Sequence, residues 1–181
     1  MKLTPIHLLG RHLKKSLDRL KQDKSASAAV EFALLAIPFL TILMAMLETG
    51  YFYFIAVLLE GATAEAGRQI RTGNIQQSAA PIEAFKEQLC NNMFNVVACN
   101  DLRVDVRNFA QFSAANPPAI GDNNGDETFA PGAAGDVIVA RVIYEFQFIT
   151  PFLGQLLNNN GESEARLLVS RAAFRNEPFG S

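Results

Sequence analysis

Two cysteines have the type and spacing that most directly predict a chemical bond in this chain. Cys90 and Cys99 lie nine positions apart in the sequence, and two cysteines in an oxidising compartment most simply form a disulfide. A metal site would need two further soft ligands, and redox catalysis usually uses the closer Cys-x-x-Cys spacing. The pair therefore predicts a structural disulfide.

The acidic residues allow two further kinds of chemistry, a calcium site and acid–base catalysis. Oxygen ligands alternate at Asp122, Asn124 and Asp126, as they do in calcium loops. The glycine, however, falls at the fourth place of this motif instead of the sixth, and no glutamate stands at the twelfth. A solvated loop is therefore favoured over a calcium site, and we expect no metal.

Catalysis has little support in the sequence. His7 and His12 are the two histidines, and both lie near the N-terminus, so no triad that needs a histidine farther along the chain can be assembled. No phosphate-binding loop, dinucleotide fingerprint or zinc spacing occurs. We expect no enzymatic activity and no cofactor, and keep as an alternative an envelope enzyme that uses four carboxylates, those of Glu83, Glu87, Asp101 and Asp105.

The charge distribution indicates where these residues lie relative to a membrane. The chain has 181 residues, a net charge of −2 and only 19% charged residues, whereas a soluble domain carries about 25%. Residues 1–24 hold seven basic and two acidic residues, and residues 61–181 hold nine basic and thirteen acidic ones. The chain as a whole shows no basic footprint for nucleic acid, and its basic N-terminus precedes an apolar run.

That apolar run predicts one transmembrane helix. Residues 32–47 and 49–59 are free of charge, and Glu48 alone separates them. A bilayer core of about 30 Å needs about 20 helical residues, so a span that begins at Val30 ends near Thr49. Tyr51 and Tyr53 then fall in the interfacial aromatic belt. A buried helix of a soluble domain and a cleaved secretory signal are the less favoured alternatives.

The orientation of the helix follows from the basic residues before it. They place the N-terminus in the cytoplasm and residues 60–181 outside, with the lipid bilayer as a partner. Pro38 lies inside the helix and removes one backbone hydrogen bond. It acts either as a plain kink or as a local melt that helps the helix pack in an assembly.

The remaining pattern predicts an α+β domain in which a sheet packs on the long helix. The helix continues to about Arg71 and ends through Thr72-Gly73-Asn74. A second helix is expected over residues 81–93, and strands over 101–112, 136–149 and 164–174, giving a three- to four-stranded antiparallel sheet. Residues 150–157 form a bend or a helical turn, 158–161 form a turn, and 116–135 form a long loop that is functional or mobile. The expected organisation is a basic leader (1–24), a transmembrane helix (25–59) and an outer domain (60–181).

The helix and its flanks are similar to a known family. Residues 29–34 read Ala-Val-Glu-Phe-Ala-Leu, Pro38 follows early in the apolar run, Glu48 and Gly50 stand at its outer edge, and an Ala-rich helix runs from Ala62 to Arg68. With Arg175-Asn176-Glu177-Pro178 near the C-terminus, the chain resembles the TadE-like family, the pilin-like proteins (pseudopilins) of tight-adherence (Tad/Flp) pilus and secretion systems. The resemblance covers the helix closely and the rest more loosely.

The resemblance implies a single-pass protein of the bacterial inner membrane with a periplasmic domain, a minor subunit or assembly factor of the pilus. Its partners would be other pilus subunits, the inner-membrane assembly platform and a prepilin peptidase. With Glu31 at the fifth mature position, the peptidase would cut between Ala26 and Ser27, where the family usually has Gly before the cut. A membrane-tethered periplasmic binding or sensing domain unrelated to pili, with loop 116–135 holding the ligand, is the alternative.

The resemblance and the helix pattern together give the residues expected to act in assembly: Glu31, Pro38, Glu48, Ala62 and Ala66. Glu31 meets the positive end of the helix dipole. It is either a solvated interfacial acid or the partner of an amine or a cation on a neighbouring subunit. Ala62 and Ala66 repeat at i and i+4, and this face either covers the sheet of its own domain or contacts another subunit.

Overall fold

The computed structural model of the chain describes residues 24–119, 127–150, 153–157 and 165–179, with the backbone alone for residues 24–26. Its internal contacts form two compact units, residues 1–47 and residues 48–181. Residues 1–23, the proposed calcium ligands (Asp122, Asn124 and Asp126) and the expected turn at 158–161 lie outside the described residues.

One helix, α2 (Lys24–Arg71), accounts for the apolar run and its continuation. Arg68 and Arg71 lie in its last turn, where positive charge interacts favourably with the helix dipole. Gly73 follows with a φ of +82°, and its N–H donates to the carbonyl oxygen of Ile70 at 3.0 Å. This left-handed glycine ends the helix, as the sequence predicts.

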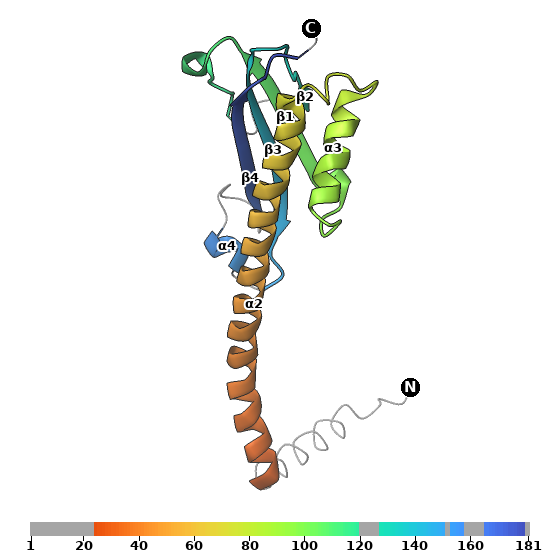
Figure 1. The fold of residues 1–181 in the computed structure, drawn as a ribbon. Coiled ribbons are helices and arrows are strands. Elements are labelled where there is room, and N and C mark those ends of the chain that lie inside the picture. Colours follow the sequence, from red (N-terminus) through yellow and green to blue (C-terminus); the bar gives the residue numbers. More distant parts are fainter. Residues whose placement is uncertain (1–23, 120–126, 151–152, 158–164, 180–181) are drawn as a thin grey trace, which may run out of the picture. The chain divides into compact units, whose positions relative to one another are not determined.

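The described strands form one mixed sheet in the order β2–β1–β3–β4 (Figure 1). Strands β1 (Leu102–Phe109), β3 (Val137–Gln147) and β4 (Ala165–Arg175) are antiparallel neighbours. The short strand β2 (Thr128–Phe129) pairs with β1 in parallel. The α+β class is confirmed, but the sheet is only partly antiparallel, because β2 arises inside the segment expected to be a loop.

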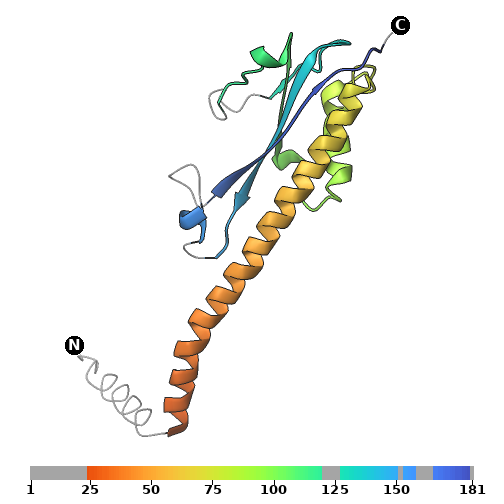
Figure 2. The same cartoon turned by 60° about the vertical axis from the view of Figure 1, so that its left-hand side comes forward.

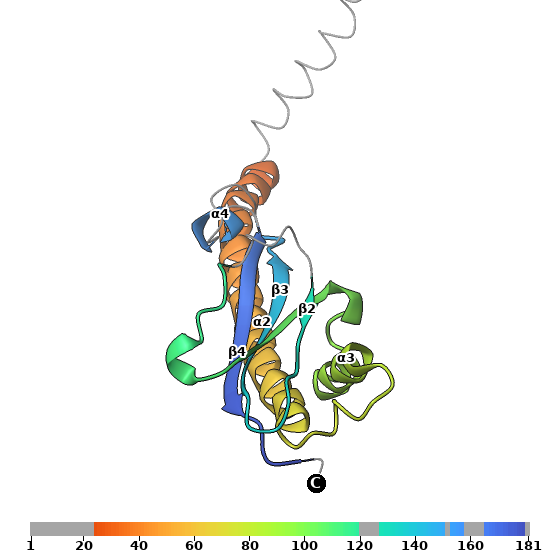
Figure 3. The same ribbon diagram turned by 90° about the horizontal axis from the view of Figure 1, so that it is seen from above.

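Helix α2 and helix α3 (Pro81–Asn92) pack on the same face of this sheet (Figure 2 and Figure 3). Alternate strand residues face the helices, since side chains of a strand alternate between its two faces. Helix α2 contributes residues at spacings of three and four, which place their side chains on one side of the helix. The core that results contains Phe52, Ile55, Leu59, Ala62, Ala66 and Ile70 of α2, Phe85 and Leu89 of α3, and Leu102, Val104, Val106, Ile138, Ala140, Val142, Phe146 and Leu168 of the strands.

Short elements complete the second unit. The helical turn η1 (Cys99–Asp101) leads into β1, η2 (Phe112–Ala114) follows it, and α4 (Leu153–Leu157) lies between β3 and β4. Helix α4 lies at the end of the sheet where β3 ends and β4 begins (Figure 1 and Figure 2). Helix α4 packs against β4 and, through Leu153 and Leu157, against the core of this unit.

Candidate assembly surface

Glu48 binds the backbone that follows β3. Its carboxylate accepts hydrogen bonds from the N–H of Ile149 and from the N–H of Thr150, the latter at 2.9 Å. Both donors lie just past Gln147, where the ladder of β3 ends, and an unpaired N–H group is costly when it is buried. The charge-assisted bonds therefore tie residues 149 and 150 to the helix.

An aromatic cluster lies beside Glu48 and joins α2 to the last residues of β3. The ring of Phe52 lies 5.3 Å from that of Phe146 and 5.6 Å from that of Phe148, measured between centroids. The guanidinium carbon of Arg166 stands 5.6 Å above the Phe52 ring, and Arg166 Nη1 donates to the carbonyl oxygen of Leu157 at 2.9 Å. Arg166 thus connects α4 to the same helical turn.

Ala62 and Ala66 are buried against the sheet of their own chain. Gly67 belongs to the same face, because a Cβ placed there would lie 2.9 Å from the Phe174 ring of β4. Small residues at these positions let the helix and the strand approach closely. A contact between α2 and another subunit therefore has to use another side of the helix.

The opposite side of α2 carries exposed apolar residues. Phe54 and Val57 are exposed in the second unit. Apart from the adjoining backbone of α2 itself, no atom of the described residues lies within 4 Å of a Cβ built at Gly50 or Gly61. Glycine inside a helix costs about 1 kcal/mol relative to alanine, and packing within this chain does not require it at these two positions. We call Gly50, Phe54, Val57 and Gly61 the outer face of α2.

The first unit contains the other residues expected to act in assembly. Glu31 is exposed, and the hydroxyl of Ser27 donates to its carboxylate at 3.4 Å. Pro38 lies inside the helix, and the Thr41 hydroxyl bonds the Ile37 carbonyl oxygen at 2.9 Å. Ala26 and Ser27, the residues on either side of the expected cut, are within the first helical turn.

The four acidic residues of the alternative hypothesis, an envelope enzyme, lie in different environments. Glu83 and Glu87 are exposed on α3, and Asp101 is exposed in η1. Asp105 is buried and bound by two arginines: Arg107 Nε lies 2.8 Å from Oδ1, and Arg141 Nε lies 2.9 Å from Oδ2. Among the described residues, no three His, Cys, Asp or Glu side chains are grouped so as to hold a metal ion.

The Asp105 cluster also holds the segment after β1, which sequence reasoning did not find. Arg141 Nη1 donates to the Pro118 carbonyl oxygen at 2.6 Å. On the other side of residues 120–126, which lie outside the described part of the chain, Glu127 pairs with Lys86 of α3 at 2.7 Å and accepts the N–H of Val104 at 3.2 Å. Both described ends of the predicted loop 116–135 are therefore fixed to the domain.

The disulfide prediction is confirmed. The Sγ atoms of Cys90 and Cys99 lie 2.01 Å apart, and the bond joins the last turn of α3 to η1 in front of β1. The closed segment contains Phe94 and Asn95, both with positive φ. The bond therefore anchors α3 directly to the strand that follows.

The pKa values of the Glu65 carboxyl and of the Tyr144 phenol, both in the outer domain, are shifted from their ordinary values. Hydrogen bonds from Arg68 lower the pKa of the exposed Glu65 carboxyl. Burial raises the pKa of the Tyr144 phenol, and the negative charges of Tyr51 and Asp101 raise it further. Glu65 forms an exposed ion pair with Arg68, and Tyr144 packs against the core.

The comparison with known protein families agrees with the sequence motifs. Residues 26–68 match the model of the family described as TadE-like protein, which confirms the resemblance over the helix. No curated protein and no solved structure matches the chain. The match associates the chain with Tad pilus systems and leaves the residues after position 68 to be interpreted from the structure.

Proposed function

We propose that this chain is a pilin-like minor subunit or assembly factor of a Tad-type pilus or secretion system, held in the inner membrane by one helix. The observation that carries the proposal is the TadE-like match at residues 26–68, which covers nearly all of α2. Its mechanism is assembly instead of catalysis. The helix holds the subunit in the bilayer, and the outer domain contacts other pilus components.

The exposure of the first unit supports membrane anchoring. Among the described residues, α2 is the helix long and apolar enough to cross a membrane. Twelve large apolar side chains between Val30 and Leu47 are exposed. Removing one such side chain from water contributes about 1.5–3 kcal/mol, so embedding this set in lipid is strongly favourable. The basic residues before the helix favour a cytoplasmic N-terminus.

The disulfide supports a periplasmic location for the second unit. Disulfides persist in oxidising compartments and are rare in the cytoplasm, and the Cys90–Cys99 bond lies inside this unit. The orientation that follows from the basic leader and the one that follows from the disulfide agree. Protease added to spheroplasts should therefore digest residues after 60, and digestion that requires membrane rupture would contradict this orientation.

Neighbouring subunits would contact α2 through its outer face, since Ala62 and Ala66 are covered by their own sheet. Glu31 would pair with an amine or a cation of a neighbour, because a carboxylate within an apolar helix is costly without a partner. We expect Glu31→Ala to leave the outer domain folded and to reduce pilus output. Glu60→Ala, which removes an exposed acid from the same helix, is the matched control. Normal output from Glu31→Ala would refute the role of Glu31.

The function is tested by deletion and by mass. Deleting the chain should abolish or alter pili, and expressing the full chain should restore them; unchanged pili would overturn the proposal. The intact mass of the protein from its native membrane fraction then separates the two roles. A mass that corresponds to residues 27–181 indicates prepilin-type processing and favours a filament subunit. A mass of all 181 residues favours a stationary assembly factor.

A membrane-tethered binding or sensing domain is the second candidate. A shallow cavity of about 270 Å³ lies beside the predicted loop and is lined in part by Arg107, Asn116 and Pro118. A small ligand there would contact the cluster that holds the loop ends. Failure of pilus components to co-purify with the detergent-solubilised chain, together with normal pili after deletion, would favour this candidate.

A further inference from the structure

Two apolar side chains of the second unit are unusually exposed. Ile149 is 88% exposed and Leu156 is 80% exposed, more than any other large apolar residue in the described part of the chain. They lie on either side of the start of α4. A globular domain gains nothing in water from presenting two such side chains seven positions apart in sequence.

Both residues are held beside the turn of α2 that begins at Glu48, where the charge-free stretch 32–47 ends. The N–H of Ile149 bonds to Glu48, the residue directly after the charge-free stretch 32–47. Leu157, next to Leu156, bonds to Arg166, which stacks on Phe52. Phe52 is four positions after Glu48, about 6 Å farther along the helix at 1.5 Å per residue.

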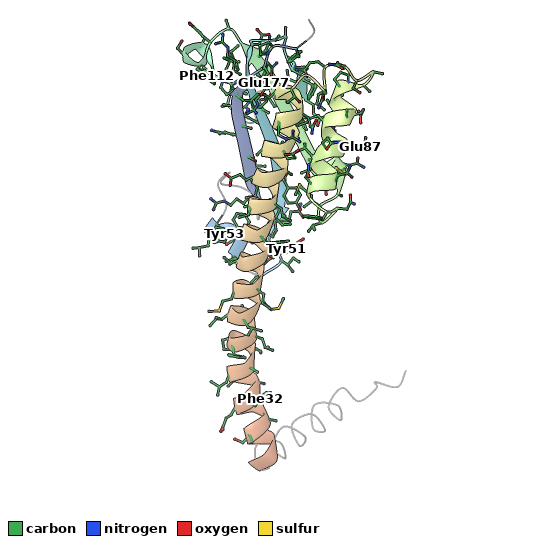
Figure 4. All side chains as sticks on the ribbon, in the orientation of Figure 1. Phe32, Tyr51, Tyr53, Glu87, Phe112 and Glu177 are labelled. Carbon is green, nitrogen blue, oxygen red and sulfur yellow. A yellow bond between two sulfur atoms is a disulfide. The ribbon has the colours of Figure 1, made fainter. Side chains whose placement is uncertain are left out.

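Two exposed tyrosines occupy the same end of the unit. Tyr51 and Tyr53 project from α2 near α4, whereas Phe112 and Glu177 lie at the opposite end (Figure 4). Tyrosine rings are enriched where a membrane meets water. We call Tyr51, Tyr53, Ile149 and Leu156 the apolar rim.

The backbone N–H groups of Ile149 and Thr150 have a hydrogen-bond partner within the protein, as an environment without water requires. In water, the exposed N–H of Ile149 would need no protein partner, but in a bilayer each unpaired backbone group is costly. Glu48 accepts both this N–H and that of Thr150. The Glu48 carboxylate thus accepts both hydrogen bonds, and the two N–H groups partly offset its negative charge.

We propose that the apolar rim inserts into the outer leaflet of the bilayer that the helix crosses. Ile149 reaches the edge of the hydrocarbon, and Leu156 with the two tyrosines lies among the lipid headgroups. The rim joins exposed residues of α2 within the second unit to a second segment that is about 100 positions away in sequence. Its two tyrosines, a residue type enriched where a membrane meets water, favour lipid over a protein partner. The inference rests on the membrane anchoring in the proposed function, and it adds a second contact that holds the outer domain against the membrane.

The test measures the depth of single positions in lipid. The full chain, with its native disulfide intact, is reconstituted in phosphatidylethanolamine–phosphatidylglycerol vesicles. An environment-sensitive fluorophore is attached to one added thiol in Ile149→Cys, Leu156→Cys or Phe112→Cys. Nitroxides carried on lipid headgroups or at shallow acyl positions then quench labels that lie near them. Phe112→Cys is the matched control, because Phe112 is also apolar and exposed but lies at the other end of the unit.

The label in Ile149→Cys should show blue-shifted emission and lose most of its fluorescence to shallow acyl nitroxides. The label in Leu156→Cys should be quenched best by headgroup nitroxides, and that in Phe112→Cys by neither. Labels in Ile149→Cys and Leu156→Cys that behave like the Phe112→Cys label would overturn the proposal. Blue-shifted emission without lipid quenching would also overturn it, because another protein would then cover the rim.

A fourth variant separates this inference from the function on which it rests. Leu40→Cys places the label inside the charge-free run, where deep acyl nitroxides should quench it if the helix spans the bilayer. Quenching in Leu40→Cys without quenching in Ile149→Cys and Leu156→Cys refutes the rim alone. Absence of quenching in all three variants refutes the rim and the membrane anchor together.

Discussion

Replacing Glu48 with glutamine tests whether this carboxylate holds the end of β3 on the helix. The native carboxylate accepts the N–H of Ile149 with one oxygen and that of Thr150 with the other. A glutamine side chain has one acceptor oxygen, and its NH₂ group cannot accept a hydrogen bond. Glu48→Gln therefore keeps the size of the side chain, removes its charge, and leaves one of the two backbone donors without a partner.

The magnitude follows from the burial of the two donors. A hydrogen bond to a charged group contributes about 1.5–3 kcal/mol, but water can replace the bond at Ile149, which is exposed. Thr150 is only 8% exposed, so water cannot replace its bond. The neutral glutamine weakens this charge-assisted bond even where its oxygen keeps the contact. We take the lower end of the range, about 1.5 kcal/mol. Because 1.4 kcal/mol is a factor of ten in an equilibrium constant, local opening at Thr150 should rise about tenfold.

Amide hydrogen exchange of the full chain in detergent micelles measures this opening. The Thr150 amide should exchange about tenfold faster in Glu48→Gln than in the wild type, while the amides of β3 before Gln147 keep their protection. Glu60→Gln is the control, because Glu60 is an exposed acid on the same helix. Its exchange pattern should match the wild type.

Two results would refute the reasoning. Exchange at Thr150 that is the same in Glu48→Gln, in Glu60→Gln and in the wild type would mean that the carboxylate does not hold the backbone. Faster exchange throughout β3 and β4 would mean that the substitution unfolds the domain instead of releasing the segment after β3.

Three further predictions concern the stability of the outer domain, measured as the free energy of unfolding of the full chain in detergent. Gly67→Leu should lower the free energy of unfolding by about 1–3 kcal/mol, because the new side chain has no room against β4. Gly61→Leu should raise it by roughly 0.5–1 kcal/mol, because leucine is a better helix former than glycine and the site is open. Equal effects of the two substitutions would refute the packing argument. Replacing both Cys90 and Cys99 with alanine should cost about 2.5–3 kcal/mol on the chain-entropy estimate for a loop of this length, and a stability equal to the wild type would refute it. Asp105→Ala should cost about 3–5 kcal/mol, because it leaves a buried arginine unpaired, and a double variant that also replaces this arginine with methionine should recover part of the loss; no recovery would contradict the pairing.

The sequence alone predicted those helices, strands and bonds that are determined by residues close to one another in the chain. Gly73 ends α2 because a left-handed residue is needed there. The alternation of apolar and polar residues in β1 and β3 places their even-numbered residues on the helix side. The disulfide was predictable because its two cysteines are close in sequence and outside the expected membrane segment.

Pairings between distant residues were not predictable in the same way. Strand β2 has two residues and exists only because it lies beside Asp105 and Val106 of β1, so its own sequence shows no alternation. The ion pair of Asp105 with Arg141 depends on the register of β1 and β3, which places these two residues opposite each other. Register is set by packing and by turn geometry across the sheet, and a single sequence does not contain that information directly.

The long apolar run shows why hydropathy alone does not locate the end of the membrane anchor. The run continues almost unbroken to Leu59, and the sequence analysis therefore extends the membrane and pilin-like helix over residues 25–59. The bilayer thickness alone predicts that a span beginning at Val30 ends near Thr49. Phe52, Ile55 and Leu59 are nevertheless buried by the sheet of the second unit, whereas the large apolar side chains from Val30 to Leu47 are exposed. Hydropathy records that a side chain avoids water, but lipid and protein satisfy this requirement equally well. The helical period separates them, because burial on one side at spacings of three and four begins at Phe52. Glu48 lies at this change and bonds to the domain, which favours a span that ends near Thr49 over one that ends at Leu59.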